Sequence, residues 1–128
     1  MNRPLALIID DNKTNLQIIG NLLEREGLDH IDLLDSRKTA STIQTIDNLT
    51  IVFLDLEMPG LNGYDVLSLF QADARFHSVP VVAYTVHVSE TSEAFNRGFH
   101  SFLAKPLDPD EFPAQLASIL GGQRIWVR

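Results

Sequence analysis

The chain has 128 residues, of which 45% are hydrophobic, and it contains no cysteine. This length and composition predict one domain with one ordinary core, and the missing cysteines exclude disulfides, thiolate metal sites and a cysteine nucleophile. The formal charge of −7 disfavours direct nucleic-acid binding, because phosphates would be repelled. The sequence has neither an apolar stretch of the roughly 20 residues that cross a bilayer nor a signal-peptide pattern, so we expect a cytoplasmic protein without a membrane contact.

Apolar runs and helical repeats alternate along the first half of the chain. Residues 5–9 predict a buried strand, and the apolar spacing over residues 13–26 predicts a helix that stops at Gly27. Residues 28–34 predict an edge strand, because charged residues interrupt their apolar pattern. Ser36 is the candidate N-cap of a helix that extends to about residue 47 and turns Ala40, Ile43 and Ile46 inward.

The second half continues the alternation. Strands are predicted at residues 51–54, 81–84 and 101–104, and helices at residues 63–74, 89–97 and 108–120. Ser89 is the candidate N-cap of the second of these helices, and Pro113 should distort the first turn of the last one. Five strands alternating with five helices are typical of an α/β fold in which helices cover both faces of a parallel sheet.

Four of the predicted strands end in polar or charged residues. Asp10 and Asp11 follow the first strand, Asp55 follows the third, Thr85 ends the fourth, and Lys105 follows the fifth. The carboxyl ends of parallel strands form the edge of an open sheet where ligands bind. Each residue alone has an ordinary explanation, such as a helix cap or a solvated lysine. Four polar or charged strand ends at one edge predict a functional site.

The residue types at this edge indicate phosphoryl chemistry with a metal. Three carboxylates held together repel one another, and a hard divalent cation relieves that repulsion. We expect Mg²⁺, with Mn²⁺ as a substitute, because it prefers oxygen ligands and accepts phosphate oxygens. Lys105 offers a positive charge and Thr85 a hydroxyl to phosphoryl oxygens, which leaves one carboxylate free to attack phosphorus and form an aspartyl phosphate. The sequence has no glycine-rich phosphate-binding loop, so the expected donor is another phosphorylated group.

With these residues identified, the chain resembles the response regulator receiver domains of two-component signalling, and its length is nearest to the single-domain chemotaxis type. The resemblance extends from about Leu5 to Leu120. It depends on Asp10-Asp11, on Phe53-Leu54-Asp55-Leu56-Glu57-Met58-Pro59-Gly60 with Asn62-Gly63, on Thr85 and on Lys105-Pro106. It implies a doubly wound (βα)5 flavodoxin-like sheet with strand order 2-1-3-4-5. Residues 1–122 would form the receiver domain, and residues 123–128 a C-terminal tail or the start of a linker.

The resemblance also assigns roles at the site. Asp55 would accept a phosphoryl group from a sensor histidine kinase or a histidine phosphotransfer protein. Mg²⁺ would be ligated by the side chains of Asp11 and Asp55, by Asp10 through water, and by the backbone carbonyl of Glu57. Lys105 would pair with the phosphoryl group.

Other residues would read the phosphoryl group or limit its lifetime. Thr85 would move toward it, Phe102 holds the aromatic switch position without the hydroxyl of a tyrosine, and the bond before Pro106 would be cis. Glu57 and His87 would tune dephosphorylation, and Val86 would narrow access to the pocket. Residues 89–120 would then shift to bind a downstream protein or form a homodimer.

Two alternatives compete with this interpretation. A haloacid-dehalogenase-like phosphatase would need an aspartate two positions after Asp55, where Glu57 stands, and more chain for a substrate cap. A receiver-like scaffold that works without phosphorylation would usually lack an acidic residue or the lysine, and this chain has all of them. We therefore expect no separate enzyme, but a phosphoacceptor domain that assists its own Mg²⁺-dependent phosphorylation and dephosphorylation.

Four residues outside the site leave smaller expectations. We interpret His30, His77 and His100 as surface residues. The sequence places no second metal-ligating residue at the usual spacing from any of them. The end of the chain, around Trp126, is either a packed terminus or the start of a linker. Packing is favoured because an exposed tryptophan would lower solubility.

Overall fold

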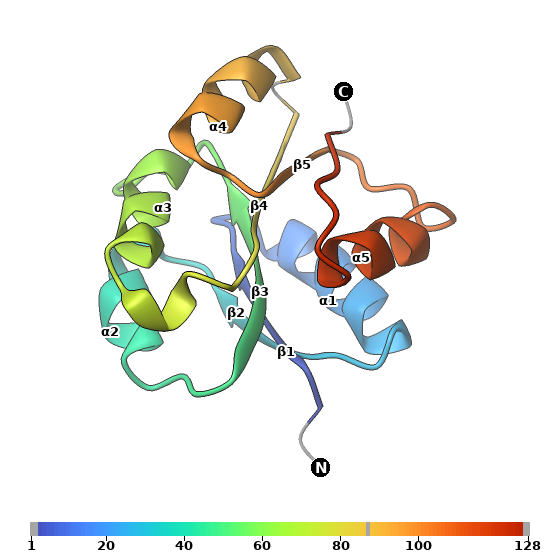
Figure 1. Ribbon diagram of the computed structural model, residues 1–128, viewed down its shortest axis with the longest axis horizontal. Helices are drawn as coiled ribbons and strands as arrows, with labels where there is room; N and C mark the ends of the chain where they lie inside the picture. The colour runs from blue at the N-terminus through green and yellow to red at the C-terminus, as the bar shows by residue number, and fades with distance from the viewer. Residues whose placement is uncertain (1–2, 87, 127–128) are drawn as a thin grey trace.

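A parallel sheet forms the centre of the molecule. The computed structural model describes residues 3–86 and 88–126. Its five strands lie in the order β2-β1-β3-β4-β5, all neighbours are parallel, and helices cover both faces of the sheet (Figure 1). The doubly wound fold and the strand order are therefore confirmed, and β2 is an edge strand as predicted.

Strands and helices alternate along the chain. The strands are β1 (Leu5–Ile9), β2 (Asp29–Leu33), β3 (Leu49–Asp55), β4 (Val81–Thr85) and β5 (Ser101–Ala104). The α-helices are α1 (Lys13–Arg25), α2 (Thr39–Ile43), α3 (Gly63–Gln71), α4 (Thr91–Arg97) and α5 (Phe112–Leu120). Short 3₁₀-helices, η1 (Ser36–Lys38), η2 (Ala74–Phe76) and η3 (Val88–Glu90), precede α2, follow α3 and precede α4. Each crossover thus contains a helix, as connections between parallel strands usually do.

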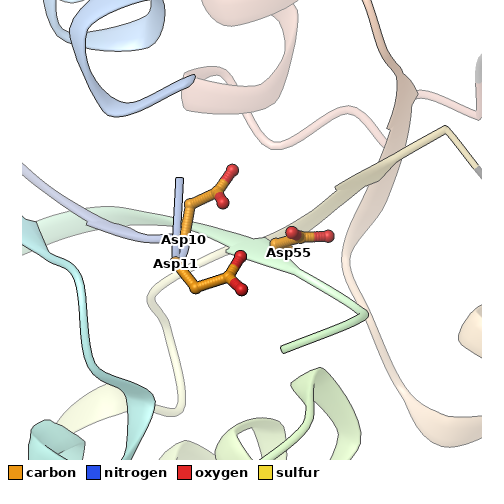
Figure 2. Close-up of side chains that lie close together, drawn as sticks. All are labelled: Asp10, Asp11 and Asp55. Carbon is orange, nitrogen blue, oxygen red and sulfur yellow. The ribbon is translucent and has the colours of Figure 1, made fainter. Parts of the chain in front are cut away.

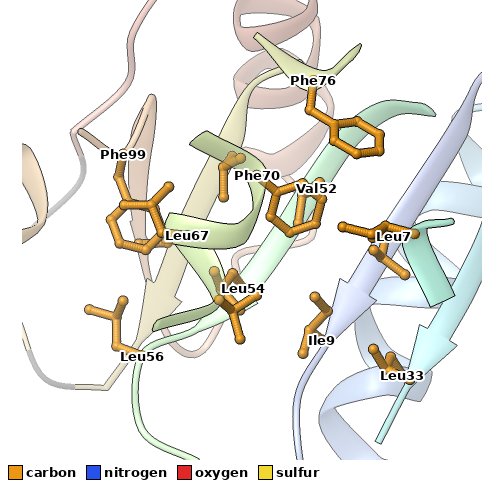
Figure 3. Packing of buried hydrophobic residues seen from close by; sticks show 14 of the residues in the cluster. Leu7, Ile9, Leu33, Val52, Leu54, Leu56, Leu67, Phe70, Phe76 and Phe99 are labelled. Atoms are coloured by element: carbon orange, nitrogen blue, oxygen red, sulfur yellow. The ribbon is translucent and has the colours of Figure 1, made fainter. Parts of the chain in front are cut away.

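The sheet has a hydrophobic core on each face. Helices α1 and α5 pack on one face, and α2, α3 and α4 pack on the other. Because strand side chains alternate in direction, Val52 and Leu54 of β3 face α3, while Ile51 and Phe53 face α1 and α5. Figure 3 shows Val52 and Leu54 packed beneath Phe70. Burial on both faces explains why the centre of β3 is a continuous apolar run.

The region after β2 differs from the prediction. Asp35, rather than Ser36, caps the turn by accepting the amide of Arg37, and the α-helix that follows has only five residues. Ser36 is buried and donates its hydroxyl to the carbonyl of Leu61 at 2.6 Å, which anchors the loop after β3. Ala40, predicted to face the core, is exposed. Serine and threonine are weak helix formers, so tertiary contacts determine this segment.

Two other helices begin later than predicted. Ser89 lies within η3, and α4 begins at Thr91 without a side-chain cap. Asp108 caps a turn by accepting the amide of Asp110, and α5 begins only at Phe112. Pro113 then falls in the first helical turn, where the missing N–H has no intrahelical partner to lose. The helix starts late because that position suits proline.

Two of the three predicted surface histidines, His30 and His100, are only partly exposed. His30 is half-buried between Asp32 and Glu24, with nitrogen–oxygen distances of 2.7 Å and 3.2 Å. His100 is also half-buried, and His77 is exposed.

Among the described residues, none of the helices is long and apolar enough to cross a bilayer.

Gly63 tests how closely α3 must approach the end of β3. A Cβ at this position would lie 2.7 Å from the Asp55 carbonyl oxygen. We expect Gly63→Ala to lower the free energy of unfolding by about 2–3 kcal/mol, because backbone must move to admit the methyl group. Urea denaturation measures this loss.

Gly27→Ala is the control for that substitution. Gly27 has a φ of 84° and open space around its Cβ position, so only backbone strain of about 1 kcal/mol is expected. Equal losses in the two variants would contradict the importance of the close approach at Gly63.

Candidate functional site

The predicted site residues meet at the carboxyl edge of the sheet. Asp10, Asp11 and Asp55 each offer a carboxylate oxygen, and these oxygens all lie within 4.8 Å of one another. Figure 2 shows the three side chains close together at the ends of β1 and β3. Asp10 is fully buried, Asp55 is 7% exposed and Asp11 is exposed. The cluster therefore has a solvent-facing side at Asp11 and a buried side at Asp10.

Lys105 brings the positive charge into this cluster. Its Nζ lies 3.0 Å from Oδ2 of Asp10 and 3.3 Å from Oδ2 of Asp55, and only 13% of its side chain is exposed. The ammonium thus bridges the two buried carboxylates. One cation against three carboxylates leaves the site with an excess of negative charge.

The environment of Asp55 favours its neutral form. Burial raises the pKa of Asp55 to about 6, and the negative charge of Asp10 adds to the rise. Lys105 opposes it, as does the backbone amide of Glu57, which donates to Oδ1 of Asp55 at 3.3 Å. Desolvation exceeds these stabilising contacts, so Asp55 loses its proton at a higher pH than a solvated aspartate does.

Tyr84 is a functional residue that the sequence reasoning missed. Its hydroxyl donates to Oδ2 of Asp10 at 2.5 Å, and Nζ of Lys105 lies 4.4 Å from the centre of its ring. Burial and the charge of Asp10 raise the pKa of Tyr84, so the hydroxyl stays protonated and remains a donor. One feature of the sequence could have indicated this role. Tyr84 brings a hydroxyl to the next-to-last position of a strand that is otherwise apolar before Thr85.

The remaining contacts fix Asp10 and the end of β4. The backbone amide of Asn12 donates to Oδ1 of Asp10 at 2.9 Å, so each oxygen of this buried carboxylate accepts at least one hydrogen bond. Thr85 is 1% exposed, and its carbonyl accepts the amide of Lys105 at 2.9 Å. The peptide bond between Lys105 and Pro106 is cis.

The described residues among those predicted to switch or to tune the site differ in their burial. Phe102 is fully buried on β5, and its ring stacks on Trp126 with centroids 6.1 Å apart. Val86 is 63% exposed and lines a hollow of about 440 Å³ together with Lys105 and Pro106. Glu57 is exposed, and His87 lies outside the described residues.

The acidic cluster fits a hard divalent cation. All three side chains offer oxygen ligands, the type that Mg²⁺ prefers, and two of them are buried where their mutual repulsion is poorly screened. A cation held there would offset the negative charge that Lys105 leaves uncompensated. The site is therefore compatible with Mg²⁺.

The raised pKa of Asp55 predicts a stability profile. The folded chain binds this proton with a pKa of about 6, against 3.8 for the model carboxyl that represents the unfolded chain. Stability is therefore lost as pH rises from about 4 to about 6, and the loss is complete above that window. We expect Asp55→Asn to be more stable than wild type at pH 7.5, on the order of 1–3 kcal/mol, with a smaller gain at pH 4.

Urea denaturation at the two pH values without divalent cations measures this difference. Asp110→Asn, which removes an exposed carboxylate outside the acidic cluster, is the control for the loss of one charge. A gain at Asp55 that is independent of pH would contradict the explanation by ionisation.

Tyr84→Phe tests the hydrogen bond to Asp10. This substitution keeps the ring beneath Lys105 but removes the donor to a fully buried carboxylate, so we expect a loss of about 1.5–3 kcal/mol in the free energy of unfolding. Tyr64→Phe is the matched control, because the Tyr64 hydroxyl donates to Glu90 at 3.1 Å in a half-buried setting. The control should lose less than about 1 kcal/mol, and losses of equal size would show that Asp10 does not need Tyr84.

Comparison with known proteins identifies the family. The model of the response regulator receiver domain matches residues 6–117. The chain is 30% identical over 127 residues to response regulator Rre1 of Synechocystis, covering 97% of this chain but 55% of Rre1, so it spans about half of that relative. It is 28% identical over 120 residues to chemotaxis protein CheY1 of Helicobacter pylori, covering 90% of this chain and 95% of CheY1.

A solved structure has the same fold. A putative response regulator from Chloroflexus aurantiacus matches with a TM-score of 0.85 at 21% identity, over 94% of this chain and 99% of that one. These matches favour the receiver over the haloacid-dehalogenase-like phosphatase. By its fold and the family match over residues 6–117, the chain belongs to the response regulator receiver domain family.

Proposed function

We propose that Asp55 is the phosphoacceptor of this receiver and that a histidine kinase or a histidine phosphotransfer protein phosphorylates it. The observation that carries this assignment is the position of its carboxylate, buried at the end of β3 beside Lys105 and two further carboxylates. With a pKa of about 6, Asp55 is about nine-tenths ionised at pH 7, which a nucleophile requires.

The transfer step uses the carboxylate and the lysine. An oxygen of Asp55 forms a bond to phosphorus as the phosphorus–nitrogen bond of the donor phosphohistidine breaks, and the leaving imidazole keeps the electron pair and takes up a proton. The Glu57 amide orients the carboxylate through Oδ1. Lys105, already 3.3 Å from Asp55, moves to the phosphoryl oxygens, and the hydroxyl of Thr85 approaches a third oxygen.

Asp11, Asp55, the Glu57 backbone carbonyl and, through water, Asp10 would hold Mg²⁺. When bound, the ion neutralises charge on the phosphoryl oxygens. Tyr84 and the Asn12 amide keep Asp10 hydrogen-bonded after Lys105 leaves it. The buried carboxylate therefore does not lose all of its partners when the lysine moves.

The domain works as a switch in this proposal. Residues 1–122 form the receiver, residues 123–128 the tail, and the elements between residues 89 and 120 present a changed face to a downstream protein or a second copy. Phe102 and Thr85 transmit the change, while Glu57, Val86 and His87 set how fast water removes the phosphoryl group. Such a receiver would act in the cytoplasm and without contacting nucleic acid or membrane.

Acetyl phosphate tests the assignment directly. With Mg²⁺ present, intact-mass spectrometry should show one added phosphoryl group per chain, and the label should disappear in Asp55→Asn and after chelation of the metal. Asp110→Asn is the control and should label like wild type. Labelling of Asp55→Asn would contradict the assignment of the acceptor.

The same sample discriminates the alternatives. Steady turnover of para-nitrophenyl phosphate would favour a phosphatase that acts on external substrates. A labelled chain with unchanged oligomeric state and partner affinity would favour a scaffold that does not respond to phosphorylation.

A further inference from the structure

The chain folds back onto its own edge strand after α5. Residues 124–126, here called the C-terminal cover, run along the free edge of β5 (Figure 1). The amide of Phe102 donates to the carbonyl of Ile125 at 2.8 Å, and the amide of Ile125 donates to Oγ of Ser101 at 3.0 Å. Phe102 and Trp126 form a parallel β-bridge. The cover therefore takes the place of a sixth strand at the edge of the sheet.

Side chains fasten the cover to β5 and to α4 at the same time. The Trp126 ring stacks on Phe102 at an interplanar angle of 16° and lies 5.2 Å from the ring of Phe95 on α4. The Arg124 guanidinium lies 4.8 Å from the centre of the Phe95 ring and donates to the carbonyls of Phe99 and His100. Main-chain and aromatic contacts together give this edge a defined occupant.

The cover is held in a way that permits release. Within the described residues, the indole N–H of Trp126 is buried without a hydrogen-bond partner. A buried donor of this kind regains a partner when water reaches it, which offsets part of the contact energy lost on release. The cover makes one β-bridge with β5, whereas a full strand would make a ladder.

We propose that the edge of β5 is a strand-accepting surface, that the C-terminal cover occupies it in the resting chain, and that an extended partner segment with an aromatic side chain takes its place. Main-chain hydrogen bonds would give such a segment affinity, and the space over Phe102 and beside Phe95 would select its aromatic ring. The cover excludes competitors because a short linker from α5 gives it an effective concentration on the order of mM.

The surface is connected to the phosphorylation site through β5 and the residue after it. Phe102 lies beneath Trp126, and Lys105, three residues further along, contacts Asp55 at 3.3 Å. In the second part of the proposal, the movement of Lys105 toward the phosphoryl group shifts β5 and weakens the stacking of Phe102 on Trp126. This second part rests on the proposed function: phosphorylation of Asp55 favours release of the cover.

A peptide tests the strand-accepting surface without any phosphoryl group. The probe is a fluorescein-labelled peptide with the sequence of residues 121–128, and fluorescence anisotropy reports its binding to the full chain. We expect Trp126→Ala and Arg124→Ala, which weaken the resident cover in different ways, to bind the peptide at least about tenfold more tightly than wild type does.

The matched control is the same peptide with alanine in place of its tryptophan, which should not bind. Equal binding of the peptide to wild type and both variants, or binding to none of them, would contradict the proposal that the edge of β5 accepts a strand. Two variants are used because one of them, Arg124→Ala, keeps the Trp126 ring that stacks on Phe102.

Trp126 itself tests the link to phosphorylation, because it is the only tryptophan in the chain. We expect its emission in the wild-type chain to shift to the red as acetyl phosphate labels Asp55, in proportion to the labelled fraction measured on the same sample. Asp55→Asn should show no shift. A labelled chain without a shift overturns the link, whereas an unlabelled chain contradicts the proposed function and leaves the peptide result to decide the surface.

Discussion

The ion pair between Lys105 and the two buried carboxylates is the constraint on which the site depends. Asp10 is fully buried, and an uncompensated charge there would be strongly destabilising. Lys105 at 3.0 Å, the Tyr84 hydroxyl and the Asn12 amide together compensate it. The fold can therefore hold a carboxylate in its interior, and the sheet must keep β1, β4 and β5 in register to do so.

Compensation at the site is incomplete, and its function follows from this. Burial and the charge of Asp10 raise the pKa of Asp55 to about 6, although Lys105 opposes the rise. Asp11 adds a third carboxylate nearby. A divalent cation would bring the positive charge that the site lacks, and the oxygens of a phosphoryl group would draw Lys105 away from Asp10. The same excess of negative charge that destabilises the resting site thus favours the loaded one.

The sequence predicted the residues whose positions follow from strand order, and it failed where tertiary contacts decide. Asp10, Asp11, Asp55 and Lys105 were predictable because each lies at the end of an apolar run, and parallel strands bring those ends together. Tyr84 was not, because its role depends on which carboxylate lies across the sheet from it. The sequence predicts a helix cap at Ser36, whereas its buried hydroxyl donates to the carbonyl of Leu61, because both roles suit a serine before a polar helix.

Tertiary contacts also decide where the end of the chain lies. The apolar character of Ile125 and Trp126 indicated packing, but their place on β5 depends on the turn at Gly121-Gly122 and on the backbone groups that β5 leaves unpaired. An edge strand with unpaired groups attracts another strand, and here the nearest one is the chain's own. Because Phe102 and Lys105 lie three residues apart, at β5 and just beyond its end, whatever covers this edge contacts the strand that positions the lysine. The strand β5 therefore has two roles. It positions the lysine that contacts Asp55, and its edge holds the C-terminal cover.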